Sequence, residues 1–343
     1  MIEYRPFGQT GITVSAIGMG CGRLGSSWHK QSTRAGKAGV AAALECGITF
    51  FDTADCYGLG RSERLLGREV RRMGRRSDVV IATKYGLVKT PAAVARGVAS
   101  SWDTVERAGG SRLTAVVGET RRLLNERKSY SSRYIERAVE ASLRRMRTDY
   151  VDVLLLHSPS KSVLNDVGFV ETLKGLKKKG TIRAYGLSLL TAEDARLALS
   201  RFSLDCIEIE VNLCSGATTN SLLSDAQRSG VAVIARQPFA SGALLARGAE
   251  ASRSAGGAGD GAPGSVRKAC LQFVLLDDRV SVMIPGMTRP EHVRQNVSAA
   301  TSEPLPQGLI EEIQRRVCVA RSGNDNSRSG VWSGTRAKSQ QTQ

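Results

Sequence analysis

Four polar residues stand at or just after the ends of short apolar runs, and together they could move a proton onto a carbonyl oxygen: Asp52, Tyr57, Lys84 and His157. A lysine ammonium beside a phenol stabilises the phenolate, so we expect the pKa of Tyr57 to fall from about 10 toward the working range. A carboxylate such as Asp52 keeps the lysine charged and oriented. Histidine can hydrogen-bond a carbonyl oxygen. The set predicts general acid catalysis of C=O reduction.

The elements that must position these residues alternate along the chain. Apolar, β-branched runs predict strands, and segments of helical period separate them. Strands that are apolar on both faces predict a parallel sheet covered by helices, and eight such units predict a closed α/β (β/α)8 TIM barrel. The strands are expected over 16–20, 49–52, 79–84, 151–157, 182–188, 206–212, 231–237 and 281–285. The helices are expected over 33–46, 61–73, 131–146, 168–179, 191–201, 219–229, 265–276 and 290–299.

Three segments fall outside this repeat. Residues 4–14 predict an N-terminal β-hairpin that plugs the barrel bottom. Residues 87–130 form a long insertion after the third strand, which either shapes a substrate pocket or only decorates the surface. Residues 319–343 are rich in Ser, Gly, Arg and Gln, so we expect a disordered tail and a barrel domain over 1–318.

One pattern favours a different fold. Gly20-Cys-Gly22-Arg-Leu-Gly25 matches GxGxxG after a strand, and Asp52 lies downstream, as in a dinucleotide-binding Rossmann domain. In that fold a helix opens at the glycines, whereas here the polar stretch 26–33 comes first. The Rossmann reading therefore stands as the weaker alternative to the barrel.

Composition limits the function classes. The chain has 343 residues, 41% of them hydrophobic, and a formal net charge of +17. Much of the excess lies in 61–150, on helix faces without interleaved aromatic residues, so we expect a solvated arginine-rich surface and no nucleic-acid partner. No apolar run is long enough to span a membrane, and the first residues do not resemble a signal peptide, so we expect a cytoplasmic protein. Seven scattered cysteines without a CxxC pair predict neither a disulfide framework nor a metal site, and they favour a reducing compartment.

These motifs resemble those of the aldo-keto reductase family, particularly its bacterial NADP(H)-dependent oxidoreductases. Asp52-Thr-Ala-x-x-Tyr57-Gly, with Ser62-Glu63 and Leu66-Gly67, is similar to the family's first signature. Later blocks follow in order: Ala82-Thr-Lys84, Ser142-Leu-Arg-Arg-Met with Asp149 and Asp152, Leu156-His157, and Ile284-Pro285-Gly286 with Asn296. The resemblance spans about residues 2–318 and implies that Asp52, Tyr57, Lys84 and His157 form a catalytic tetrad.

The resemblance also implies where NADP(H) binds. Ser188 matches a serine that holds the nicotinamide amide, but the asparagine that follows it in the family is Leu189 here. Glu208 stands where the family has glutamine, and Arg236 where an aromatic residue often stacks; a guanidinium also stacks. Arg289 is the expected partner of the 2′-phosphate, near a helix N-terminus that favours anions. The full cofactor set is Gly22, Ser188, Glu208, Arg236, Gln237, Phe239, Ser241, Gly286, Arg289, His292, Gln295 and Asn296.

The function implied is NADP(H)-dependent interconversion of an aldehyde or ketone and its alcohol, with Tyr57 as general acid/base and without a metal. The expected partner is a small carbonyl or alcohol substrate, and the expected state is a monomer or small homo-oligomer. Two alternatives stay open. One is a cofactor-binding regulatory subunit with little turnover; the other is a non-redox tailoring enzyme on the same barrel.

Overall fold

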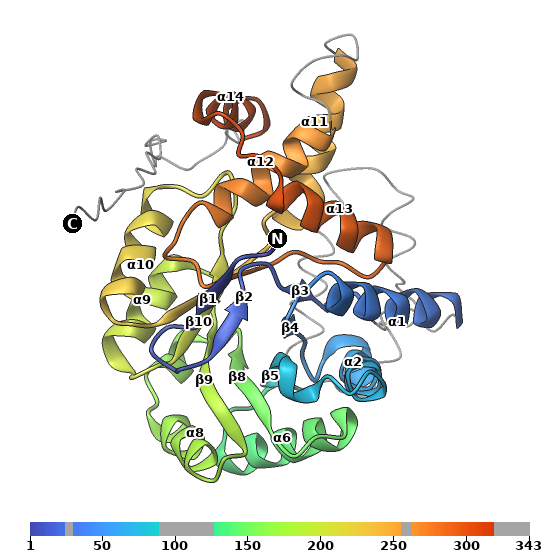
Figure 1. Cartoon of the computed structure of the whole chain (residues 1–343). Helices are drawn as coiled ribbons and strands as arrows, with labels where there is room; N and C mark the ends of the chain where they lie inside the picture. The colour runs from blue at the N-terminus through green and yellow to red at the C-terminus, as the bar shows by residue number, and fades with distance from the viewer. Residues whose placement is uncertain (25–29, 89–126, 255–262, 319–343) are drawn as a thin grey trace, which may run out of the picture.

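Eight parallel strands form one sheet that closes on itself. The computed structural model describes residues 1–24, 30–88, 127–254 and 263–318 (Figure 1). Neighbouring strands follow the order β12-β11-β10-β9-β8-β5-β4-β3, and the isolated bridges Ile17–Met283 and Gly20–Gly286 join the first strand to the last. The predicted barrel is confirmed, and the Rossmann alternative was wrong. The strands are β3 (Met19–Gly20), β4 (Phe50–Asp52), β5 (Val80–Tyr85), β8 (Val151–His157), β9 (Ile182–Ser188), β10 (Cys206–Glu210), β11 (Ala232–Arg236) and β12 (Val282–Ile284).

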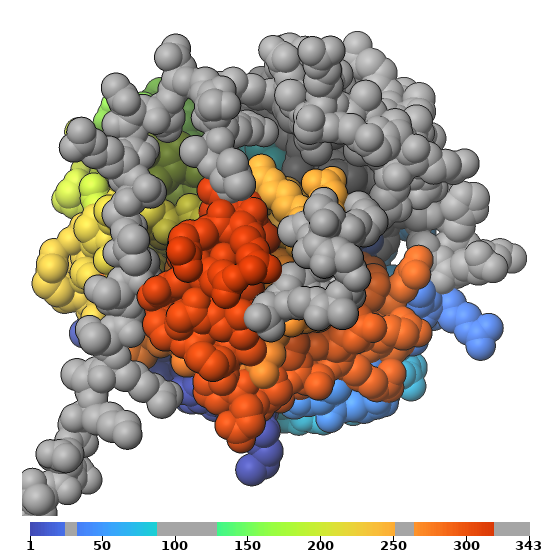
Figure 2. All heavy atoms as spheres, turned by 90° about the horizontal axis from the view of Figure 1, so that it is seen from above, coloured from blue at the N-terminus to red at the C-terminus, as the bar shows by residue number. Residues whose placement is uncertain are grey.

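Helices surround the barrel on its outer side (Figure 1). Eight of them match the predicted segments to within a few residues: α1 (Lys30–Glu45), α2 (Arg61–Arg72), α6 (Ser132–Met146), α8 (Gly168–Lys178), α9 (Ala192–Arg201), α10 (Ala217–Arg228), α12 (Pro263–Leu275) and α13 (Pro290–Thr301). Others were not predicted: α7 (Lys161–Leu164), α11 (Ala243–Ser254), α14 (Gln307–Val317) and the 3₁₀ turns η1 (Tyr57–Gly60), η2 (Arg76–Asp78) and η3 (Ala240–Gly242). The space-filling view shows orange and red C-terminal residues beside one another on one face, with blue N-terminal residues at its edge (Figure 2).

The N-terminal hairpin, β1 (Tyr4–Pro6) and β2 (Thr13–Ser15), lies across one end of the barrel (Figure 1). Phe7, Ile12 and Val14 are buried in one cluster with barrel residues that include Phe50 and Ile234. These side chains supply the apolar floor that a barrel of this width needs, since its interior is a packed core and not a pore. The predicted plug is confirmed.

Close packing of barrel elements requires glycine at several positions of the described chain, among them Gly186 and Gly67. A Cβ on Gly186 of β9 would lie 1.9 Å from the carbonyl oxygen of Cys206 on β10, and a Cβ on Gly67 of α2 would lie 2.2 Å from that of Met146 on α6. Any side chain there would push backbone apart, so both contacts depend on the missing Cβ. The helix α2, which begins just after Tyr57, is thereby held tightly against its neighbour.

Much of the expected insertion and tail lies outside the described residues. At the base of the insertion, β6 (Leu87–Val88) pairs antiparallel with β7 (Arg127–Lys128). The segment 89–126 and the tail 319–343 are among the residues that the structure does not describe. In the part of the chain that is described, no helix is long and apolar enough to cross a membrane.

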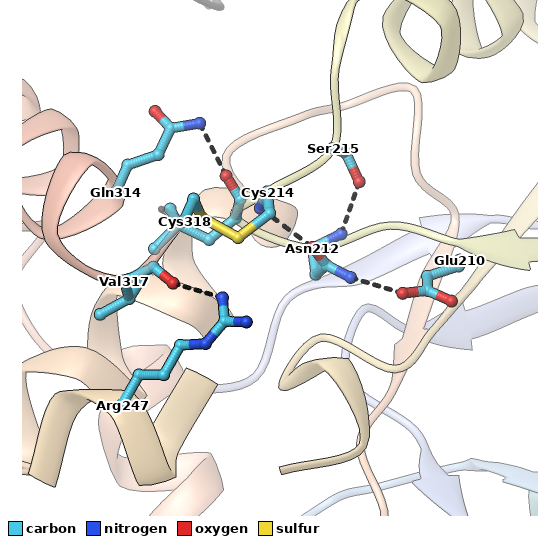
Figure 3. The surroundings of a disulfide bond; sticks show 9 residues. Glu210, Asn212, Cys214, Ser215, Arg247, Gln314, Val317 and Cys318 are labelled. Carbon is cyan, nitrogen blue, oxygen red and sulfur yellow. Dashed lines mark hydrogen bonds between the residues drawn. A yellow bond between two sulfur atoms is a disulfide. The ribbon is translucent and has the colours of Figure 1, made fainter. Parts of the chain in front are cut away.

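A disulfide joins Cys214, in the loop after β10, to Cys318, directly after α14, across 104 residues of sequence (Figure 3). The expectation that disulfides are absent was wrong for this pair. Two hydrogen bonds fasten the same junction: Gln314 Nε2 donates to the carbonyl of Leu213 (2.7 Å), and Arg247 donates to that of Val317 (2.8 Å). The sequence hid the pair because the large separation leaves no local spacing to recognise and α14 was not expected.

We predict that this cross-link stabilises the folded chain. Closing a loop of about 100 residues restricts the unfolded ensemble, and such bonds typically contribute roughly 2–4 kcal/mol. Urea unfolding should therefore show that Cys214→Ser, or dithiothreitol on wild type, lowers the free energy of unfolding by about that amount. The control is Cys46→Ser, which removes a half-buried free thiol and should cost well under half as much. A wild-type urea midpoint that does not change when dithiothreitol is added would contradict the prediction.

Candidate active site

A buried lysine lies at the centre of the barrel mouth. Lys84, on β5, is 1% exposed, and its Nζ donates to Asp52 Oδ1 at the end of β4 and to the carbonyl of Thr53 (3.3 Å). A second carboxylate, Glu208 on β10, places its Oε2 3.1 Å from the same Nζ. Adjacent parallel strands end at one rim, which is why β4 and β5 bring Asp52 and Lys84 together.

Tyr57 and His157 face the lysine from the rim. Lys84 Nζ lies 5.4 Å from the centre of the Tyr57 ring, and the Tyr57 and His157 rings meet edge-to-face at 5.9 Å. Cys56 Sγ is 3.6 Å from His157 Nδ1, and Tyr130 donates from its hydroxyl to the carbonyl of His157 (2.9 Å). The structure thus brings the four predicted residues of the tetrad into one cluster.

The ionisation of this cluster differs from the expectation for Tyr57. Burial raises the pKa of Tyr57, and this effect outweighs the lowering by Lys84; the carboxylates of Asp52 and Glu208 raise it further. The expected fall of this pKa was therefore wrong. The phenol keeps its proton at neutral pH, which suits a proton donor better than a base.

The two carboxylates compete for one cation. Burial first, and then the charge of Glu208, raise the pKa of Asp52 to about 8, although Lys84 acts in the opposite direction. The pKa of Lys84 is raised: burial is the largest single influence and lowers it, but Asp52, Glu208 and Tyr57 together outweigh burial. Lys84 therefore stays charged at neutral pH.

Buried polar contacts position the tetrad from below. Thr53 and Ser62 share a hydrogen bond between hydroxyls (2.8 Å), and Ser62 also donates to the carbonyl of Cys21 (3.1 Å). Glu63 accepts from the hydroxyl of Thr83 (2.8 Å) and pairs with Arg145 of α6. These contacts tie the start of α2 to β4 and β5, so the loop that carries Tyr57 is fixed at both ends.

The residues predicted for the nicotinamide end adjoin the tetrad. Ser188, at the end of β9, donates to Glu208 Oε1 (3.0 Å), whereas Glu208 Oε2 accepts no hydrogen bond although it is buried. Arg236 donates to the carbonyl of Leu189 (3.1 Å) and lies 3.7 Å from Glu210. Gln237 follows in the left-handed region at φ 57°. Gly22 lies against the Tyr57 ring: a Cβ added to Gly22 would lie 3.8 Å from a ring carbon.

The chain of contacts continues outward from Arg236 to the disulfide. Glu210 accepts from Asn212 Nδ2 (2.9 Å), and Asn212 Oδ1 accepts from the backbone N–H of Cys214 (2.9 Å), as Figure 3 shows. The cross-linked C-terminal helix and the barrel rim are therefore connected through two polar side chains.

A second group of predicted residues lies at the N-terminal end of α13. Arg289 occupies the position before the helix, its side chain does not cap the helix, and Pro290 begins it. Burial, followed by the charges of Arg289, Arg267 and Arg23, lowers the pKa of His292, so this imidazole is neutral at pH 7. Arg23, Arg267 and Arg289 therefore all lie close enough to His292 for their charges to act on it. Other predicted residues nearby are exposed (Ser241, Gly286, Gln295), half-buried (Phe239) or buried (Asn296).

Sequence reasoning missed Arg267 on α12. Its guanidinium donates to Asn296 Oδ1 (2.8 Å) and lies 5.7 Å from the Phe239 ring centre, so it joins two predicted cofactor residues. A single arginine on a helix carries no sequence signal of such a role. The hydrogen bond occupies Asn296 Oδ1, which leaves the amide nitrogen of that side chain as its donor.

Much of the positive charge lies away from the mouth. A cavity of about 390 Å³ between α2 and α6 is lined by Arg64, Arg68, Ala141, Arg144, Arg145 and Arg147. No aromatic side chain lines it, so it offers no platform for stacking bases. The expectation that the protein has no nucleic-acid partner stays a prediction.

Comparison with known proteins finds a matching family, similar proteins and a similar solved structure. The model of the aldo/keto reductase family matches residues 16–316. L-galactose dehydrogenase from Arabidopsis thaliana is 27% identical over 334 residues, which cover 91% of this chain and 93% of the plant protein. An aldo-keto reductase from Schizosaccharomyces pombe named with NADP(+) is 30% identical, over 58% of this chain and 49% of its own. The holo form of an aldo-keto reductase from Bacillus halodurans superimposes with a TM-score of 0.70 at 26% identity, covering 93% of this chain and 98% of that one.

We predict a pH dependence of stability from Asp52. Its pKa is about 8 in the folded chain and about 3.9 when unfolded. Because the folded pKa is the higher one, its contribution is fully present below about pH 4 and is lost as the pH rises through 8. The free energy of unfolding should therefore fall between pH 6 and 9 in wild type, and less steeply in Asp52→Asn. Parallel urea titrations check this, and equal slopes would contradict it.

Proposed function

The chain belongs to the aldo/keto reductase family, and from this premise we propose that this oxidoreductase uses NADP(H) to interconvert an aldehyde or ketone and its alcohol. We propose Asp52, Tyr57, Lys84 and His157 as its catalytic residues. One observation carries the proposal. Lys84, a buried cation, is held by Asp52 and lies 5.4 Å from the ring of a phenol that keeps its proton.

The roles of these side chains follow from their contacts. Tyr57 donates its proton to the carbonyl oxygen in reduction, because it is the acidic group at the rim nearest Lys84. Lys84 stabilises the phenolate left behind, and Asp52 keeps Lys84 in place. His157, edge-to-face with Tyr57, hydrogen-bonds the substrate oxygen and orients it. A bound nicotinamide supplies the hydride for reduction and accepts it in the reverse reaction.

The residues present fit that cofactor. Glu208 Oε2 is a buried acceptor without a hydrogen bond, which suits the N–H of a carboxamide, with Ser188 beside it. At the other end, three arginines and the free N-terminus of α13 suit a phosphate. The NADP(+) in the name of the yeast relative describes that protein, and it agrees with this choice. We assign the 2′-phosphate to Arg289, and Arg267 joins the proposed set beside Phe239 and Asn296.

The proposal extends to the parts that build the pocket. We propose that residues 1–318 act as one catalytic unit and that the segment 87–130 contributes to substrate selection, because it begins just after β5, the strand that carries Lys84, and ends at Tyr130, which contacts His157. A regulatory subunit with little turnover and a non-redox enzyme are the competing functions. Oxidation of NADPH with a panel of aldehydes distinguishes them, since only the proposed enzyme turns over with a loss of NADPH absorbance.

We predict that Tyr57→Phe lowers the turnover number by about 10² or more, because it removes the general acid. The ring and its contact with His157 remain, so folding and cofactor affinity should be nearly unchanged. Steady-state reduction, with the cofactor dissociation constants as a check, tests this. Cys46→Ser, a change outside the mouth, is the control. Near-normal turnover in Tyr57→Phe would refute the assignment.

We predict that Arg289→Ala weakens NADPH binding by about 1.5–3 kcal/mol, the range for a hydrogen bond to a charged group, while NADH binding hardly changes. His292 does not replace the lost charge at pH 7, since its pKa is lowered. Fluorescence titration with both cofactors measures the effect. Arg294→Ala is the matched control, because Arg294 is exposed and lies near Glu45 (3.8 Å). Equal losses for NADPH and NADH would show that Arg289 does not contact the 2′-phosphate.

A further inference from the structure

Glu208 is a second carboxylate on a lysine that already has one. Its side chain is 3% exposed, Oε1 accepts from Ser188, and Oε2 lies 3.1 Å from Lys84 Nζ without a hydrogen bond. Asp52 holds the same ammonium group from β4. Within the described chain, Lys84 is the one cation paired with either carboxylate. Arg236, on the neighbouring strand β11, lies beside Glu210 instead.

The local charge is therefore out of balance. With both carboxylates ionised, the cluster of Asp52, Glu208 and Lys84 has a net charge of −1 in a buried place, and below pH 8 a proton on Asp52 compensates that charge. Such an excess charge is costly unless something compensates it. The raised pKa values of Asp52 and Tyr57 are two signs of that cost, since Glu208 contributes to both. A positive charge near this cluster is therefore stabilised, because it compensates the second carboxylate.

Hydride transfer delivers such a charge. A reduced nicotinamide ring is neutral and an oxidised ring carries +1, whereas the rest of the cofactor is the same in both. The hydride reaches the carbon of the C=O bond whose oxygen contacts Tyr57. The ring must therefore lie within a few ångströms of the substrate, close to the cluster around Lys84.

We propose that Glu208 is a specificity-determining residue, whose buried carboxylate stabilises the positive charge formed on the nicotinamide ring and so favours carbonyl reduction over alcohol oxidation. This inference rests on the proposed function. In the favoured direction the substrate carbon gains the hydride with its electron pair, and the C=O π pair moves to oxygen. That oxygen takes the proton of Tyr57, water restores the proton, and the cofactor is oxidised. An amide such as glutamine at this position would lack the charge.

Two consequences of Glu208 act together. Its charge lowers the free energy of the oxidised ring relative to the reduced one, and it also helps to keep the proton on Tyr57, where reduction needs it. Both follow from one full negative charge at short range in a poorly screened site. If Glu208 acted only through the shape of its side chain, neither of these two effects would arise.

The test compares affinities for the two oxidation states. We expect fluorescence titration of the full chain to show that Glu208→Gln, which keeps size but removes charge, raises the dissociation constant of NADP⁺ about tenfold. The constant for NADPH should stay within about threefold. Glu208→Asp keeps the charge and should keep the ratio of the two constants near that of wild type. Glu69→Gln is the matched control, because it neutralises another buried glutamate, on α2 beside Arg72, and should leave both constants unchanged.

A second measurement, the pH profile of carbonyl reduction, reports the protonation of Tyr57. In Glu208→Gln, the upper pH limb of carbonyl reduction should move to lower pH, since Tyr57 then loses its proton more easily. Equal weakening of NADP⁺ and NADPH, or an unchanged ratio in Glu208→Gln, would overturn the inference. So would a ratio changed as much in Glu208→Asp as in Glu208→Gln. Failure of wild type to bind either cofactor would instead refute the proposed function.

Discussion

The ion pair between Lys84 and Asp52 is the constraint on which the mouth of the barrel depends. A lysine that is 1% exposed is tolerated only when a carboxylate compensates its charge. That requirement fixes β4 against β5 in a register that puts Asp52 opposite Ala82, two residues before Lys84. Tyr57 and Glu208 then take positions around a charge that is already placed, so the site is assembled from strand ends and from the short loop after β4 that carries Tyr57.

Around this pair lies a layer of buried polar contacts that connects strands to helices. Glu63 at the start of α2 binds Thr83 of β5 and Arg145 of α6. Asp152, fully buried in β8, accepts from the backbone N–H of Ile81 (3.0 Å) and pairs with Arg76 and Arg183. Each carboxylate has partners on at least two elements, so neither is left unpaired in the interior. These residues belong to the motifs that resemble the family, and their contacts indicate that they support the mouth without lining it.

Sequence reasoning succeeded where the signal was local or repeated. The eight strands were predictable because each is a short buried run, and the tetrad because each member stands at a strand end or in the loop after one. It failed where the cause lies between distant parts. The bond from Cys214 to Cys318, the contact of Arg267 with Asn296, and the balance that raises the pKa of Tyr57 all depend on side chains brought together only by closure of the barrel. The helix α14 was missed because it follows the last β/α repeat and no strand directly precedes it.

The opposite charges at the two ends of the proposed cofactor site have one consequence for orientation. Near the tetrad, two buried carboxyl groups share one lysine, whereas at α13 the charges of three arginines act on a neutral histidine. A dinucleotide that carries a phosphate at its adenosine end and a ring able to become cationic at the other matches this polarity in a single direction. Reversal would place the phosphate beside Asp52 and Glu208, where its charge is repelled in a poorly screened site. In the proposed site, charge alone therefore favours the orientation that brings the reactive ring to Tyr57.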